Sequence, residues 1–127
     1  MARLTYRSIG SSLGEWPAWI RALKTSSGVY AIRDRHTGRV LYVGSSGGRL
    51  YDTITRHFQQ WHRTKNWWKG MYGAGHDPGL VYLRERCDVA VIVTAKGDHL
   101  TAEAQLISRL QPRDNLVEHP DGEEIPF

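Results

Sequence analysis

Two apolar segments, residues 29–33 and 39–43, lie close together in the first half of the chain. Both are rich in β-branched and aromatic side chains, which favour extended backbone. The stretch between them, residues 34–38, has the polar and glycine composition of a turn. The pattern therefore predicts a β-hairpin that brings two phenol groups, those of Tyr30 and Tyr42, close together on facing strands.

Apolar residues recur at helical spacing before and after this hairpin, in residues 15–24 and 50–62. A spacing of three or four residues places such side chains on one face of a helix, where they can meet a core. We therefore predict one helix in each segment. The residues expected to face the core are Trp16, Trp19, Ile20 and Leu23 in the first helix, and Leu50, Ile54, Phe58 and Trp61 in the second.

The second half of the chain contains one more strand pattern and one more helix pattern. Residues 90–94 are a short apolar, β-branched run, which is typical of a central strand that is buried on both faces. Residues 100–110 predict a helix that Asp98 can cap and that Pro112 ends. Together these elements predict a small α/β domain with a central three-stranded, mainly antiparallel sheet flanked by helices.

Length and composition allow one folded unit, because a chain of 127 residues can bury a single core. We place it in residues 27–117, after an N-terminal lead with a possible short helix (1–26) and before an acidic tail (118–127). Residues 63–79, with clustered glycines, are predicted to form a long loop or insertion. Cys87 is the only cysteine, which excludes a disulfide framework and a cysteine-based zinc site. We expect it to be a small buried residue beside the third strand.

Charge and hydropathy restrict the partners. The formal net charge of +4 and the pI near 9.5 favour an anionic partner, for which nucleic acid is the usual choice. No apolar stretch is long enough to span a bilayer, and the N-terminus lacks the apolar core of a secretion signal. We therefore expect a cytoplasmic protein without a membrane partner.

Four short motifs follow one another along the chain. They are Gly-Val-Tyr at residues 28–30, Tyr-Val-Gly at 42–44, Glu-Ala-Gln-Leu-Ile at 103–107 and Gln-Pro-Arg-Asp-Asn at 111–115. In this order they resemble the motifs of the GIY-YIG nuclease family, over most of the chain. The resemblance implies the small GIY-YIG-type fold and a metal-dependent endonuclease that hydrolyses phosphodiester bonds of DNA. The implied cofactor is Mg²⁺ or Mn²⁺.

The resemblance also implies roles for individual residues. Glu103 would bind the divalent cation, although a helical glutamate is more commonly a solvated surface residue. Tyr30 or Tyr42 would be the base that activates the attacking water, and the other would orient that base by a hydrogen bond, unless both simply pack across the hairpin. His57 would contact the phosphate or the leaving group, or lie beside the core. Asn115, on the substrate side, would support the end of the Glu103 helix or orient Tyr30 more than act on DNA directly.

Members of the family usually place an arginine one helical turn before the helix histidine, and Thr53 occupies that position here. Arg49 lies one turn earlier on the same helix face, and Arg56 is adjacent to His57. We expect Arg49 to bind the phosphate, with Arg56 as the alternative and as a substrate contact. Both could instead belong to a solvated helix face.

Cationic and aromatic residues alternate in the loop after the second helix. Arg63, Lys65 and Lys69 are expected to contact the substrate, or to serve solubility alone. The chain has no room for a separate DNA-binding domain, so targeting is expected from this loop, a protein partner or a homodimer. The alternative function is a noncatalytic nucleic-acid-binding or adaptor domain that retains the fold.

Overall fold

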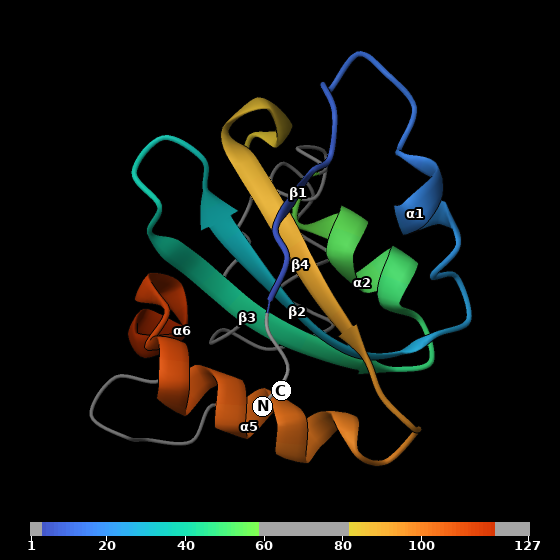
Figure 1. Cartoon of the computed structure of the whole chain (residues 1–127), viewed down its shortest axis with the longest axis vertical. Coiled ribbons are helices and arrows are strands. Elements are labelled where there is room, and N and C mark those ends of the chain that lie inside the picture. Colours follow the sequence, from blue (N-terminus) through green and yellow to red (C-terminus); the bar gives the residue numbers. More distant parts are fainter. Residues whose placement is uncertain (1–3, 59–81, 119–127) are drawn as a thin grey trace, which may run out of the picture.

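A computed structural model describes residues 4–58 and 82–118 of the chain. Four antiparallel strands form one sheet in the order β1-β4-β2-β3, and helices pack against it (Figure 1). The strands are β1 (Arg7–Ser8), β2 (Ser27–Asp34), β3 (Val40–Gly47) and β4 (Cys87–Val93). The helices are α1 (Ala18–Arg21), α2 (Leu50–Arg56), the 3-10 helix η1 (Arg84–Arg86), α5 (His99–Leu110) and α6 (Arg113–Glu118). The predicted α/β class is confirmed.

The sheet has four strands where the sequence predicts three. The additional strand, β1, pairs only Arg7 and Ser8 with β4, and so short a strand leaves no periodic pattern to detect. Because β1 covers the outer edge of β4, β4 lies inside the sheet, and the predicted central position of this strand is confirmed.

The predicted hairpin is formed by β2 and β3. Asp34 Oδ1 accepts hydrogen bonds from the backbone N–H groups of His36 and Thr37, at 2.8 and 3.0 Å, and Gly38 has a φ of 77° that favours glycine. In the register of the two strands, Tyr30 faces Gly44 and Ile32 faces Tyr42. Both tyrosines therefore point to the same face of the sheet.

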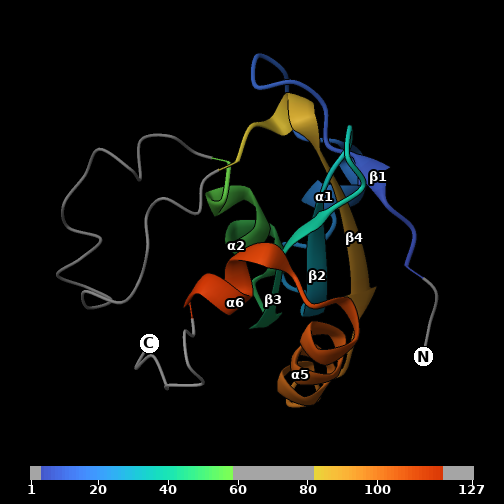
Figure 2. The same ribbon diagram turned by 90° about the vertical axis from the view of Figure 1, so that its left-hand side faces the viewer.

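Each face of the sheet carries its own core. Tyr30 and Ile32 pack with Ile20 of α1 and with Leu50 and Ile54 of α2. Alternate residues of the same strands, with Val29, Ala31 and Val43 among them, pack on the other face against Leu106 of α5. Figure 2 shows this second layer, with α5 viewed nearly along its axis.

The N-terminal lead belongs to the first of these cores. Its residues Ile9, Ile20 and Leu23 are buried in the same cluster as Tyr30, so residues 4–26 fold together with the predicted domain. The acidic tail begins at Glu118, the last residue of α6, and residues 119–127 lie outside the described part of the chain.

The helix boundaries differ from the predicted ones. The first helix, predicted over residues 15–24, is limited to the four residues of α1, because Pro17 marks its start and Trp16 lies before it. The second ends at Arg56, with residues 57 and 58 in a turn, and the rest of the predicted range lies outside the described residues.

The third predicted helix agrees closely with α5. It begins one residue early, at His99, and Asp98 occupies the cap position without making a side-chain capping bond. Gln111 follows in a left-handed conformation with a φ of 48°, and Pro112 comes next, so the predicted end is confirmed. None of the helices in the described ranges is long and apolar enough to cross a bilayer.

Candidate active site

Tyr30, Tyr42 and His57 lie together on the α2 side of the sheet. The Tyr30 hydroxyl oxygen is 2.8 Å from Nε2 of His57, a hydrogen-bond distance. The ring centroids are 4.7 Å apart for Tyr42 and His57, and 6.3 Å apart for Tyr30 and Tyr42. The hairpin supplies both phenols and the end of α2 supplies the imidazole. The structure thus brings together three of the residues singled out from the sequence, and we call them the tyrosine–histidine cluster.

Gly44 makes room for this cluster. A Cβ atom at this position would lie 2.4 Å from the Tyr30 hydroxyl oxygen and 2.5 Å from its Cζ atom. Real Cβ atoms essentially never approach so closely, so the Tyr30 ring can occupy its place only because residue 44 is a glycine. Residue 44, the last of the Tyr-Val-Gly motif, must therefore be a glycine to leave space for the ring of Tyr30 on the opposite strand.

Glu103 approaches the same strand from the other face. The Ser45 hydroxyl donates a 2.9 Å hydrogen bond to Oε1 of Glu103, and Ser45 pairs with Val29, which faces α5. Helix α5 comes close to β3 at Gly47 as well, where a Cβ would lie 2.9 Å from Cε1 of His99. The Glu103 carboxylate is therefore held beside Ser45. It lies on the face of the edge strand β3 that is opposite to the tyrosine–histidine cluster.

The carboxylate of Glu103 and the hydroxyl of Ser45 are oxygen ligands of the kind that a hard cation prefers. Within the described residues no group of three His, Cys, Asp or Glu side chains gathers to hold a metal ion. One carboxylate with a neighbouring hydroxyl still fits Mg²⁺, which keeps several of its waters and is commonly bound through one or two carboxylates and the substrate phosphates. Glu103 and Ser45 are thus the residues that could hold such an ion.

Arg49 lies at the start of α2, with a side chain that is 80% exposed. It forms an ion pair with Asp52, at 3.2 Å between Nη2 and Oδ2. Its backbone carbonyl accepts hydrogen bonds from both the N–H and the hydroxyl of Thr53, each at 3.0 Å. Thr53 thus supports the first turn of the helix. Arg56 is the last residue of α2 and is half-buried.

Asn115 is buried and its amide group is bound to the backbone of β3. Val43 N–H donates to Asn115 Oδ1 at 2.7 Å, and Asn115 Nδ2 donates to the Val43 carbonyl at 2.9 Å. The amide replaces a neighbouring strand at the outer edge of β3, directly beside Tyr42. This geometry favours the supporting role over the expected substrate contact, because the side chain is only 4% exposed.

Three of the expected substrate contacts, Arg63, Lys65 and Lys69, lie outside the described residues. Cys87, in contrast, is described and buried at the start of β4, as predicted. Burial, with Asp34 and Asp88 nearby, raises the pKa of its thiol to about 11. The thiol therefore stays protonated near neutral pH, and Cys87 serves packing.

Two residues of the site have no signal in the sequence. The buried Tyr82 donates its hydroxyl to Oδ2 of Asp114, and its ring centroid lies 6.1 Å from that of His57. Arg113 holds the same carboxylate with two hydrogen bonds, at 2.7 and 2.9 Å. Tyr82 and Asp114 are far apart in the sequence, and only the place of Asp114 beside Asn115 could have drawn attention to it.

The ionisation of this pair follows from its surroundings. Burial and then the hydrogen bond to Asp114 raise the pKa of Tyr82, so its hydroxyl remains a proton donor. Burial alone would raise the pKa of Asp114 too, but the hydrogen bonds from Arg113 and Tyr82 outweigh it and lower that pKa. A neutral phenol therefore donates to a charged carboxylate.

The sequence matches no protein-family model and no curated protein. The functional argument for this chain therefore depends on its own residues and their geometry.

Proposed function

We propose that this chain is a metal-dependent endonuclease of the GIY-YIG type, which hydrolyses phosphodiester bonds in DNA. The observation that carries the proposal is the hydrogen bond between Tyr30 and His57 beside the Tyr42 ring. On strand β3, Ser45 follows Gly44 and donates a hydrogen bond to Glu103. Packing of a hairpin alone requires neither a phenol bonded to an imidazole nor a glycine at residue 44, where a Cβ would clash with the Tyr30 ring.

The tyrosine–histidine cluster can supply the base. A buried phenol loses its proton only at a cost, because burial disfavours a lone phenolate. The cost falls when His57, at hydrogen-bond distance, takes up the proton and leaves a phenolate–imidazolium pair. We therefore assign Tyr30 as the base that accepts a proton from the attacking water, and Tyr42 as the ring that packs His57 in place.

A second group is required to stabilise the negative charge that develops on the phosphate during hydrolysis. When Mg²⁺ or Mn²⁺ is bound, it stabilises the negative charge that develops on the phosphate oxygens. Glu103 would hold the ion, and Ser45 would hold the carboxylate in the orientation needed, through its 2.9 Å hydrogen bond.

Arg49 is proposed as the phosphate-binding arginine. To reach a phosphate it must leave Asp52, but an exposed ion pair is worth only about 0–1 kcal/mol. A bidentate contact to a phosphate outweighs such a loss. Arg56, adjacent to His57, is the alternative.

The alternative function is a noncatalytic nucleic-acid-binding or adaptor domain. Thr53 favours it, because it stands where the resemblance leads us to expect an arginine and is bonded to the backbone of Arg49. In either case a partner protein or a homodimer would assist targeting.

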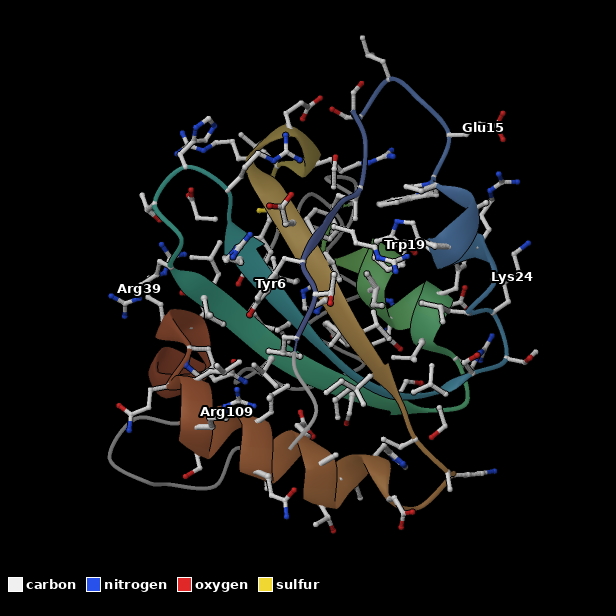
Figure 3. The ribbon with its side chains drawn as sticks, viewed as in Figure 1. Tyr6, Glu15, Trp19, Lys24, Arg39 and Arg109 are labelled. Atoms are coloured by element: carbon white, nitrogen blue, oxygen red, sulfur yellow. The ribbon has the colours of Figure 1, made fainter. Side chains whose placement is uncertain are left out.

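A plasmid assay separates the two. Purified protein with Mg²⁺ is incubated with supercoiled DNA, and the conversion to nicked and linear forms is followed with time. Glu103→Gln should abolish the metal-dependent cleavage and leave most of the DNA binding intact, since phosphate contacts come mainly from arginine and lysine. Glu15→Gln is the matched control, because Glu15 projects outward from the loop before α1 (Figure 3).

Cleavage by Glu103→Gln at the wild-type rate would disprove the metal assignment. Metal-independent DNA binding without cleavage by the wild type would favour the adaptor.

A further inference from the structure

Helix α6 binds beside two of the aromatic rings that neighbour the His57 imidazole. The rings of Tyr42 and Tyr82 have their centroids 4.7 and 6.1 Å from that of His57. Asp114 and Asn115 are consecutive residues of α6, which lies against β3 (Figure 2). Asn115 holds the strand beside Tyr42, and Asp114 holds Tyr82.

Tyr82 is tied to His57 by its backbone as well as by its ring. Its backbone N–H donates a 2.7 Å hydrogen bond to the His57 carbonyl. Its hydroxyl is anchored on Asp114, whose two oxygens are both bound by Arg113. Since the phenol is held at both ends, its ring cannot tilt away from the imidazole without breaking a buried hydrogen bond, which is costly.

We propose that Tyr82 and Asp114 form a positioning pair that orients the His57 imidazole toward the Tyr30 hydroxyl. Neither residue touches the reacting atoms. The pair acts through His57, much as an outer residue orients a ligand or a base in other sites. The catalytic consequence rests on the proposed nuclease function, whereas the orientation of the imidazole does not.

The test removes one hydroxyl and leaves the ring. Tyr82→Phe keeps the packing against His57 but loses the anchor on Asp114, and Asp114→Ala removes the anchor from the other side. Tyr51→Phe is the matched control, since Tyr51 lies on α2 and packs against the same core outside the tyrosine–histidine cluster. The double variant Tyr82→Phe with Asp114→Ala should be no worse than Asp114→Ala alone, because Asp114→Ala already removes the Tyr82 anchor together with the two bonds from Arg113.

The readout is the tautomer of His57, from long-range ¹H–¹⁵N spectra of the imidazole nitrogens. His57→Gln identifies its signals among the six histidines. We expect a single tautomer in the wild type and in Tyr51→Phe, and averaged signals in both Tyr82→Phe and Asp114→Ala. The rate of plasmid cleavage should fall by about tenfold in the same two variants with DNA affinity unchanged, as for other outer-residue changes.

The outcomes decide the proposal separately from the nuclease function. Tyr82→Phe with the wild-type His57 signals would overturn the positioning role, even if cleavage were lost. A wild type that does not cut DNA would remove the nuclease proposal, but averaged His57 signals in both variants would still support the positioning pair. Loss of folding in Asp114→Ala leaves the decision to Tyr82→Phe, which retains the ring and its core contacts.

Discussion

At Gly44, the absence of a side chain determines where Tyr30 can lie. Because a Cβ there would lie 2.4 Å from the Tyr30 hydroxyl oxygen, Gly44→Ala must displace either the ring or the strand. We expect the free energy of unfolding to fall by about 1–3 kcal/mol, as for other overpacked sites. Cleavage should fall at least about tenfold if the Tyr30–His57 bond is disturbed. Denaturant unfolding and the plasmid assay measure both effects.

The matched control for this change is Gly48→Ala. A Cβ at Gly48 would have no neighbour within 4 Å, so this variant should keep both stability and cleavage. If Gly44→Ala behaves like Gly48→Ala, the close approach of Tyr30 has no importance for the site.

The chain departs most from the family it resembles at Thr53, whose expected role we assign to Arg49. We predict that Arg49→Ala lowers the cleavage rate on the order of 100-fold or more, comparable to the loss of one preorganised charge-stabilising group. Arg56→Ala should cost less and should act mostly on binding. Its loss should lower the slope of log affinity against log salt concentration by about one.

A second substitution tests whether Arg49 and Thr53 serve the same phosphate. Arg49→Ala combined with Thr53→Arg should recover part of the activity, because it returns an arginine to the position that the family uses. A silent Arg49→Ala beside an inactive Arg56→Ala would show that Arg56 is the phosphate ligand.

At the scale of elements, Asn115 links α6 to the exposed edge of the sheet. Its amide satisfies both backbone groups of Val43, and Asn115→Ala would leave them buried without these partners. We expect a loss of about 1–3 kcal/mol in the free energy of unfolding, the usual cost of such groups. Asn115→Asp puts a carboxylate oxygen against the Val43 carbonyl in a buried place, so its loss near neutral pH should be at least as large. Equal stability of Asn115→Ala and wild type in urea unfolding would contradict the supporting role.

The elements with strong local signals could be predicted from the sequence. The hairpin has two segments rich in β-branched and aromatic residues around a turn that begins at Asp34 and ends at Gly38, and α5 has an apolar stripe with Pro112 after its end. The elements without such signals were missed or misjudged. Strand β1 has two residues, α1 has four, and α6 follows Pro112 at once, so none carries enough residues for a period to show.

The site was partly predictable for the same reason. Local pattern predicts the hairpin that carries Tyr30 and Tyr42 and the helix that ends next to His57, and the resemblance of the motifs singles out these three residues. Tyr82 and Asp114 meet only through tertiary folding, and nothing in their sequence neighbourhood indicates the contact. The two-point bond between Asn115 and Val43 is equally nonlocal.

At the scale of the whole molecule, the sheet separates the two groups of candidate residues. Its α2 face carries the tyrosine–histidine cluster, and its α5 face carries Glu103, with the edge strand β3 between them. Under the proposed function, a substrate lying along this edge would meet the base from one face and the metal ion from the other. The basic balance of the chain, with a net charge of +4, favours such a polyanion.

The most direct test of the account is the single-turnover rate of Mg²⁺-dependent plasmid cleavage by Tyr30→Phe, with Tyr51→Phe as control. The substitution keeps the packed ring and removes the hydroxyl that lies 2.8 Å from His57. We predict that the rate falls by about 100-fold or more, the size of a general-base contribution, while the melting temperature of the folded protein stays close to that of Tyr51→Phe. A rate for Tyr30→Phe within about twofold of the wild-type rate would contradict the assignment of Tyr30 as the base.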